Sequence, residues 1–312
     1  MTILIRPLQE HELPIAAQIM RLAFGTFVGA PNLTEFFSDL NYMNRWYADP
    51  QAAFAAEDQG QIIGSNIAIN WGSFGLFGPL TVHPDYWDKG IGQRLIEPAI
   101  ACFERWGTTQ NGFFTFPNSP KHLKLYQRFG FHPRSLTALM SKTVSVEPLP
   151  LQGLEYSQLP PSEQAASLKA CFELTHTLYD GLDLSREIST VAAQNLGETI
   201  LLWDDTNLVG FAVCHCGAGT EAGTHNCYIK FGAVRSGAEA EANFERLLQN
   251  CEALAAKKGL SSLNGGVNTE RYAAYYKMQS LGFRIEHLGL AMHQPNQPGF
   301  NRPDVFAIDD WR

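Results

Sequence analysis

The stretch LTVHPDYWDKGIGQRL, residues 80–95, is the most informative part of this 312-residue sequence. It reads as a strand, then a turn containing two glycines, then the start of a helix. In such a turn several main-chain N–H groups converge at the positive end of the helix dipole, where an anion binds. Gly90 and Gly92 leave the main chain bare enough for close approach. The stretch therefore predicts a pyrophosphate site, although it lacks the third glycine of a dinucleotide fingerprint and the lysine of a nucleotide-triphosphate loop.

The segments around this turn predict strands and helices in alternation, including an antiparallel meander just before the turn. The first half is expected to contain a strand at 2–7, helices at 13–24 and 34–47, strands at 52–57, 61–70 and up to 82, a helix after 84, a strand at 112–116, a helix at 121–129 and a strand at 137–143.

The same order of elements then begins again, and this internal repeat is the main organisational feature of the chain. Its length also favours two domains of about 150 residues each. The second half is expected to contain strands at 154–157, 199–204, 208–216, 227–234, 261–267 and 283–292, with helices at 162–178, 238–258 and 268–279. We therefore predict a first domain at 1–146, a proline-containing linker at 145–153, a second domain at 154–293 and a surface tail at 294–312.

Composition excludes several classes of protein. Hydrophobic residues make up 45% of the chain, which indicates globular domains with sizeable cores. The 23 basic and 31 acidic residues give a net charge of −8, so a nucleic-acid partner is not expected. The longest uncharged run, residues 59–84, is interrupted by polar residues and glycines, so it predicts strands and not a membrane span. With no signal peptide visible, we expect a cytoplasmic protein whose six cysteines are buried thiols.

Two motifs in this order resemble the GNAT superfamily of acyl-CoA-dependent N-acetyltransferases. The first is Trp87-Asp88-Lys89-Gly90-Ile91-Gly92, preceded by Val82-His83-Pro84, and the second is Asn118 followed by Leu125-Tyr126-Gln127-Arg128-Phe129-Gly130-Phe131. The resemblance covers residues 1 to about 144. Together with the repeat, it implies an α/β fold on a mixed α+β sheet, with two GNAT-like domains in tandem. Trp87 departs from the pattern, because the family prefers Gln or Arg there.

The resemblance also implies a site. Tyr126 matches the family's general acid, which protonates the departing thiolate of coenzyme A. A half-buried tyrosine that anchors a helix is the alternative for this residue. The residues implied to bind acetyl-CoA are Leu80, Thr81, Val82, Trp87, Asp88, Lys89, Gly90, Ile91, Gly92, Gln93, Asn118 and Tyr126.

The general base is not assigned by the sequence. No carboxylate lies within residues 59–84, which include the strand that often supplies one in this family. Glu35, Asp39, Glu57 and His83 are candidates only because each could lie near the cleft, and a chain of water molecules is the alternative.

The second half provides an internal control for the pyrophosphate site. If Val82 is aligned with Val234, Gly92 falls on Phe244, whose ring would fill the space that a pyrophosphate needs. Glutamates 239, 241 and 245 add negative charge near the same helix start. Tyr126 falls on Met278, which has no proton to donate, although Tyr275 and Tyr276 lie nearby. We predict that the second domain does not bind the cofactor, and that it shapes or covers the acceptor site or mediates dimerisation.

Two further features have both a functional and a structural interpretation. Cys214, Cys216 and Cys227 could face one another as metal ligands, but packed thiols are favoured because the paired Cys-x-x-Cys spacing is absent, and we predict no metal. The aromatic helix expected at 34–47 could line the acceptor cleft or simply be a packed amphipathic helix.

The sequence thus predicts an N-acetyltransferase that moves an acetyl group from acetyl-CoA directly to an amine. The acceptor is expected to be a small amine or a lysine-bearing protein, with no nucleic acid or membrane involved, and a homodimer is left open. The alternative is a non-catalytic acyl-CoA-binding or regulatory protein, which the unusual Trp87 and the unassigned base would explain.

Overall fold

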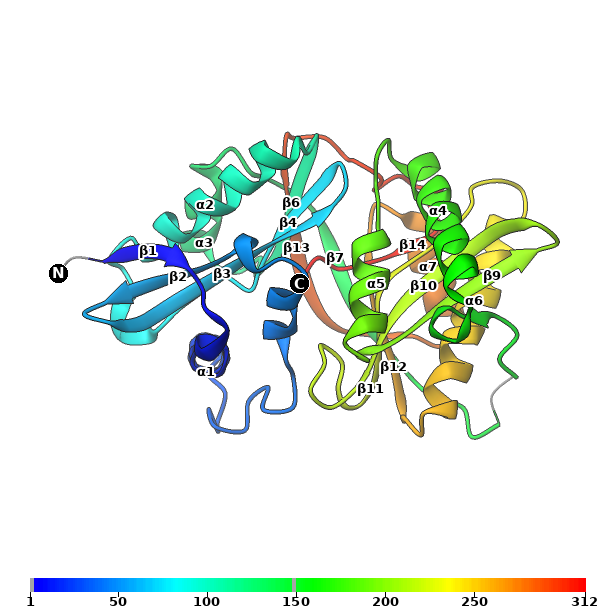
Figure 1. The fold of residues 1–312 in the computed structure, drawn as a ribbon, viewed down its shortest axis with the longest axis horizontal. Helices are drawn as coiled ribbons and strands as arrows, with labels where there is room; N and C mark the ends of the chain where they lie inside the picture. The colour runs from blue at the N-terminus through cyan, green and yellow to red at the C-terminus, as the bar shows by residue number, and fades with distance from the viewer. Residues whose placement is uncertain (1–2, 148–149) are drawn as a thin grey trace.

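The computed structural model describes residues 3–147 and 150–312. Two halves of similar architecture lie side by side, the N-terminal half in blue and cyan and the C-terminal half in green to orange (Figure 1). The described strands join in one mixed sheet of 14 strands, with helices packed against it. The predicted α/β fold with a mixed sheet is confirmed.

The first half follows the predicted order of elements closely, apart from one helix discussed below. Its elements are β1 (Leu4–Pro7), η1 (Glu10–Glu12), α1 (Leu13–Val28), η2 (Tyr42–Tyr47), η3 (Pro50–Ala52), β2 (Ala53–Asp58), β3 (Gln61–Trp71), β4 (Phe74–Phe77), β5 (Thr81–Val82), η4 (Pro84–Tyr86), α2 (Ile91–Trp106), β6 (Gln110–Thr115), α3 (Pro120–Gln127) and β7 (His132–Thr143).

The second half repeats this order, with one helix, α5, that the sequence analysis did not predict. Its elements are β8 (Leu154–Glu155), η5 (Tyr156–Gln158), α4 (Pro161–Leu178), α5 (Ser185–Ala193), β9 (Gly197–Asp204), β10 (Asn207–Gly217), β11 (Gly223–Val234), α6 (Ala240–Lys257), β12 (Ser262–Asn268), α7 (Tyr272–Ser280), β13 (Arg284–Gln294) and β14 (Ala307–Ile308).

The halves exchange their last strands. The order through the sheet is β1-β2-β3-β4-β6-β13-β7-β12-β11-β10-β9-β8. Strand β13 of the second half therefore pairs with β6 of the first, and β7 of the first half pairs with β12 of the second. The two exchanged strands also pair with each other, in the middle of the molecule (Figure 1). The boundaries at 146 and 154 describe the repeat in the sequence, and their meaning for independent folding stays a prediction.

An apolar core joins the halves. It contains Trp71 and Phe74 of the first half, Phe211 and Phe231 of the second, and Trp311, all of them buried. Burial of this many aromatic rings between the halves is a large favourable free energy, so the halves form a single packed body.

Two predictions about elements are wrong. No α-helix forms at 34–47: the chain makes turns and then the 3₁₀ helix η2, because the Asp39 carbonyl accepts from Gly219 N–H of the second half while Met43 N–H donates to the Asn41 side chain. The segment 294–312 is not a tail over the surface either. Phe300 and the stretch 305–311 are buried, and β14 pairs with β11, because the apolar side chains of this segment complete the core.

No helix in the described part of the chain is both long enough and apolar enough to cross a membrane.

Candidate functional site

The turn before α2 is open, as an anion site requires. Gly90 is the N-cap of α2 and has φ +75°, a conformation that favours glycine. A Cβ built on Gly90 meets no atom within 4 Å, and one on Gly92 meets only Leu125 Cδ2 at 3.6 Å. The first turn of α2 contains no acidic residue. Free N–H groups at the start of a 16-residue helix therefore face unoccupied space.

The other predicted residues of this turn serve mainly to hold it together. Ile91 is buried in the core, whereas Gln93 is exposed. Asp88 forms an ion pair with Lys121 at the start of α3. Lys89 Nζ donates to the Asp85 carbonyl at 2.8 Å and lies 4.6 Å from the centre of the Tyr86 ring. These contacts fix the shape of the turn but leave its main chain accessible.

Strand β5 has one free edge. His83 N–H donates to the Ile63 carbonyl of β3 at 2.7 Å. Because N–H groups alternate in direction along a strand, those of Leu80 and Val82 point away from β3, toward the opening between β5 and β6. The Trp87 indole reaches the same edge, since its Nε1 donates to the Val82 carbonyl at 2.7 Å. The N–H groups of Leu80 and Val82 remain available to a ligand in this opening.

The opening arises because β4 and β6 diverge. They pair in parallel only as far as Leu76 and Gly112. Beyond this point Pro79, which has no N–H to donate, separates β4 from β5, and β5 pairs with β3 alone in the described part of the sheet. Thr81 is buried against β3.

Tyr126 is buried in the core of the first half, beside β4 and β6. Its ring packs between Phe113 at 4.2 Å and Phe77 at 6.2 Å, measured between ring centroids. Burial raises the pKa of Tyr126 to about 12, against a smaller opposing effect of a side-chain hydrogen bond with Thr115. The hydroxyl therefore keeps its proton at any physiological pH. Asn118 is exposed in the connection between β6 and α3.

Three of the four candidate bases make other contacts. Glu57 forms an ion pair with Arg6 at 2.6 Å, and Asp39 accepts hydrogen bonds from Thr224. His83 caps η4 through Nδ1, and Glu35 is exposed. None of the four is shown near the opening, so the general base stays unassigned.

The second half shows what happens to the equivalent opening when no ligand is expected. Gly64 pairs with Val82, and Gly210 pairs with Val234 in the same register, so the two valines are structural equivalents. Val82 N–H has no hydrogen-bond partner among the described residues, whereas Val234 N–H donates to the Phe306 carbonyl at 3.2 Å. Strand β14 continues this pairing along β11 and fills the opening between β11 and β12.

The pyrophosphate turn is also filled in the second half. Phe244, the equivalent of Gly92, is fully buried and packs against Phe306 at 5.3 Å between ring centroids. Met278, the equivalent of Tyr126, is fully buried in the same core. The chain itself occupies the space that the first half leaves open.

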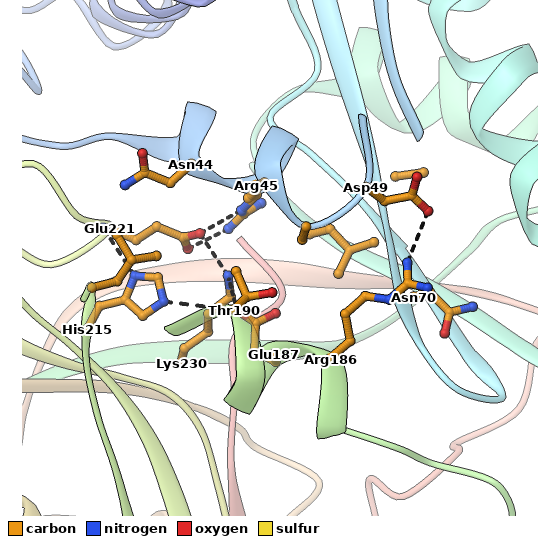
Figure 2. A pocket seen from close by; sticks show the side chains of 14 residues that line it. Asn44, Arg45, Asp49, Asn70, Arg186, Glu187, Thr190, His215, Glu221 and Lys230 are labelled. Atoms are coloured by element: carbon orange, nitrogen blue, oxygen red, sulfur yellow. Dashed lines mark hydrogen bonds and ion pairs between the residues drawn. The ribbon is translucent and has the colours of Figure 1, made fainter. Parts of the chain in front are cut away.

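A cluster of buried charges between the halves was missed by the sequence analysis (Figure 2). Arg45 forms a bidentate ion pair with Glu221, with distances of 2.6 and 2.7 Å, and donates through Nη1 to the Gly78 carbonyl at 2.9 Å. Lys230 lies 2.8 Å from Glu221 and 2.9 Å from Glu187. These residues are up to 185 positions apart and have no motif in common, so no signal in the sequence identifies them.

Four of the six free cysteines lie in two close pairs of thiols. Cys216 Sγ lies 3.8 Å from Cys227 Sγ, and Cys214 Sγ lies 3.9 Å from Cys251 Sγ. Cys227 lowers the pKa of Cys214, but the Cys251 thiol and burial outweigh this effect and raise it. The Cys214 thiol and burial raise the pKa of Cys227 against an opposing effect of Cys216, so both thiols stay protonated. No group of three or more ligating side chains with metal-binding geometry occurs within the described ranges.

A family model matches part of this chain, and several solved structures share its fold. Residues 49–133 match the family model described as an acetyltransferase (GNAT) domain. No curated protein matches the sequence significantly.

Three similar structures cover nearly the whole chain. One, provisionally described as an acetyltransferase from Pyrococcus horikoshii, has 13% identity and a TM-score of 0.70, covering 99% of this chain and 95% of its own. A GCN5-related N-acetyltransferase from Sphaerobacter thermophilus has 18% identity and a TM-score of 0.58, covering 95% and 96%. A tandem GNAT protein from the clavulanic acid biosynthesis pathway has 13% identity and a TM-score of 0.56, covering 94% and 98%. Residues 49–133 thus match the GNAT domain model, and with the repeated strand register of the two halves the chain as a whole has the fold of tandem GNAT structures.

Proposed function

We propose that the first half binds acetyl-CoA and transfers its acetyl group to an amine. The observation that carries this proposal is the difference between Val82 and Val234. In the second half a carbonyl of the chain itself accepts the hydrogen bond of Val234 N–H, whereas the equivalent N–H of Val82 has no such partner. An amide-rich chain such as the pantetheine arm of coenzyme A supplies carbonyl groups of the same kind.

The start of α2 would hold the pyrophosphate. Its main-chain N–H groups face open space, and Gly90 and Gly92 present no side chain to a bound anion. Lys121 and Lys89 lie at the same turn. This anion site and the free edge of β5 are consecutive in the chain, so one elongated ligand reaches both.

The chemistry that this arrangement supports is direct attack on the thioester. The amine nitrogen forms a bond to the acetyl carbon, and the carbon–sulfur bond breaks. Leu80 N–H would polarise the carbonyl oxygen. Tyr126 is protonated and would donate its proton to the departing thiolate, then regain one from solvent. The proton lost by the amine goes to a base or to water that we do not assign.

The alternative is a protein that binds acyl-CoA without turnover. Its supporting observation is that the Trp87 indole occupies the Val82 carbonyl, one of the polar groups on the free edge of β5. This contact removes an acceptor, but it leaves both N–H donors of the edge.

Calorimetry with acetyl-CoA, followed by an assay of coenzyme A release with a library of amines, tests both functions. The proposed enzyme binds one acetyl-CoA per chain and releases coenzyme A faster with at least one amine. Binding without any amine-dependent release would favour the alternative, and no binding would contradict both.

A further inference from the structure

A polar pocket lies between the two halves and is lined by both (Figure 2). Its first-half wall is formed by η2 and by residues 68–70 of β3. Its second-half wall is formed by α5, β10 and β11. Its cavity measures about 30 Å³, which is room for a small polar group, and it is partly open to solvent. At its rim Asp49 of the first half and Arg186 of the second form an ion pair at 3.0 Å. A molecule in this pocket contacts both halves at once.

His215 presents an unpartnered donor to this pocket. Its Nδ1 accepts a hydrogen bond from Glu221 N–H at 3.4 Å, which places the ring proton on Nε2. This Nε2 has no hydrogen-bond partner, although the side chain is only 1% exposed. Burial, and then the nearby Lys230, lower the pKa of His215 to about 4, so the ring is neutral. A buried N–H without a partner indicates that a polar group belongs beside it.

Glu187 is the acceptor beside this donor. Its Oε1 lies 4.0 Å from His215 Nε2, too far for a direct hydrogen bond. Burial opposes ionisation of Glu187, but the attraction of Lys230 outweighs it and holds the pKa of this carboxyl below its ordinary value. The carboxylate also accepts from Lys230 and from the Trp71 indole. One oxygen atom placed between His215 and Glu187 would bond to both.

This pair of groups selects a hydroxyl. A hydroxyl accepts from the His215 N–H and donates to the Glu187 carboxylate at the same time. An ammonium cannot accept, and it would also meet the positive charge of Lys230. A carboxylate or phosphate cannot donate, and Glu187 would repel it. Asn70 and Thr190 add uncharged polar groups to the lining.

The pocket reaches toward the place of transfer. Arg45 lines it and donates to the Gly78 carbonyl, two residues before Leu80. A second, smaller cavity shares Arg45, Ile69 and Lys230 with the first and extends to Phe77, where β4 and β6 diverge. The first cavity thus contains the His215–Glu187 pair, and the second borders Leu76 and Phe77 at the end of β4.

We propose that this pocket is the acceptor site and that the acceptor is a hydroxylated amine, whose hydroxyl lies between His215 and Glu187. The amine nitrogen then points past Arg45 to the opening at Leu80. This inference rests on the proposed function for the transfer step. Recognition of the hydroxyl depends only on the pocket, so hydroxyl binding and acetyl transfer can be tested separately.

The test uses two amines of equal length, 3-aminopropan-1-ol and butylamine, which differ only in a hydroxyl in place of a methyl group. Their binding to the protein saturated with coenzyme A is measured by calorimetry, and their kcat/KM with acetyl-CoA by coenzyme A release. We expect the hydroxylated amine to be at least tenfold better in both measurements. His215→Phe should remove that preference without changing the affinity for coenzyme A, and His215→Gln, which keeps an N–H donor, should restore part of it.

The outcomes separate the two proposals. Turnover of both amines without a preference overturns the acceptor site and leaves the transferase intact. A hydroxyl-dependent affinity without turnover overturns the transfer and supports the site. Equal affinities in the wild-type protein overturn the site even if His215→Phe fails to fold. A crystal soaked with 3-aminopropan-1-ol that shows only water between His215 and Glu187 would also overturn the acceptor site.

Discussion

Helices α2 and α6 begin at the same point of the repeat, but their first turns have opposite properties. The first turn of α2 has no acidic residue, the nearby Asp88 is paired with Lys121, and open space lies at Gly90 and Gly92. The start of α6 has Glu239 at its N-cap and Glu241 in its first turn, and Phe244 is packed into the core. Negative charge and an aromatic ring both oppose a bound anion. The same scaffold thus leaves the first turn of α2 open to an anion and closes the first turn of α6 to one.

The strands that precede these helices, β5 and β11, also differ in whether their outer edge is paired. A sheet whose strands diverge leaves backbone groups without partners, and such groups are costly when buried. In the second half β14 supplies those partners, whereas in the first half the edge at Val82 is left for a ligand. The backbone groups between two diverging strands therefore need hydrogen-bond partners, which either a ligand or another segment of the chain can supply.

The largest effect is expected when Gly92 is replaced by phenylalanine, the residue at the equivalent position 244 of the second half. Gly92→Phe should weaken acetyl-CoA binding by about 100-fold or more, because a ring in the turn removes two or more N–H contacts to phosphate, each worth about 1.5–3 kcal/mol. Calorimetry measures this change. Gly92→Ala is the matched control, since its Cβ meets only Leu125 at 3.6 Å. Unchanged affinity in Gly92→Phe, with the fold intact, would show that the cofactor does not bind at this turn.

The reverse change tests the second half. Phe244→Ala should destabilise the protein by about 3–5 kcal/mol, because it opens a cavity in a fully buried core. Chemical denaturation measures the loss. Acetyl-CoA should still bind with a stoichiometry of one, since β14 continues to fill the opening between β11 and β12. A second bound acetyl-CoA would break the comparison between the halves.

The sequence predicted those parts of the molecule that depend on local pattern. The meander, the glycine turn followed by a helix and the repeat all follow from the spacing of apolar residues and glycines, and the structure confirms them. The substitution of Phe244 for Gly92 was visible by alignment of the halves, and the burial of Phe244 is as expected.

The parts that were missed depend on contacts between distant segments. The exchange of β7 and β13 does not alter the pattern within either strand, so periodicity cannot reveal it. The segment 294–312 contains three prolines, which suggested a tail, although its apolar residues fill the second opening. Arg45 and Glu221 resemble ordinary surface residues in the sequence and become a buried ion pair only when the halves meet.

The proton donor gives a further test of the comparison. Tyr126→Phe should reduce kcat by about 100-fold or more and leave the affinity for acetyl-CoA unchanged, because the ring still packs while the proton is lost. Met278→Leu, at the equivalent position of the second half, is the control and should leave kcat unchanged. Rates are measured by coenzyme A release. Equal rates for Tyr126→Phe and wild type would assign Tyr126 a packing role only.

The smallest effect concerns His215, whose equivalent in the first half, by the same strand register, is the apolar Ile69. The folded protein holds the pKa of His215 at about 4, compared with 6.5 for a free histidine. Between these values the unfolded chain binds the proton and the folded protein does not, so the stability from His215 is present above pH 6.5 and is lost as the pH falls toward 4. From pH 7 to pH 5 this loss amounts to about 2 kcal/mol. His215→Gln should therefore lose about 2 kcal/mol less than wild type over that interval in denaturant titrations. The buried His293, whose pKa is also lowered to about 4, contributes equally to both proteins and cancels. Identical pH dependence in the two proteins would mean that the ring is hydrated or charged in the pocket, and it could not then serve as the neutral donor for a hydroxyl.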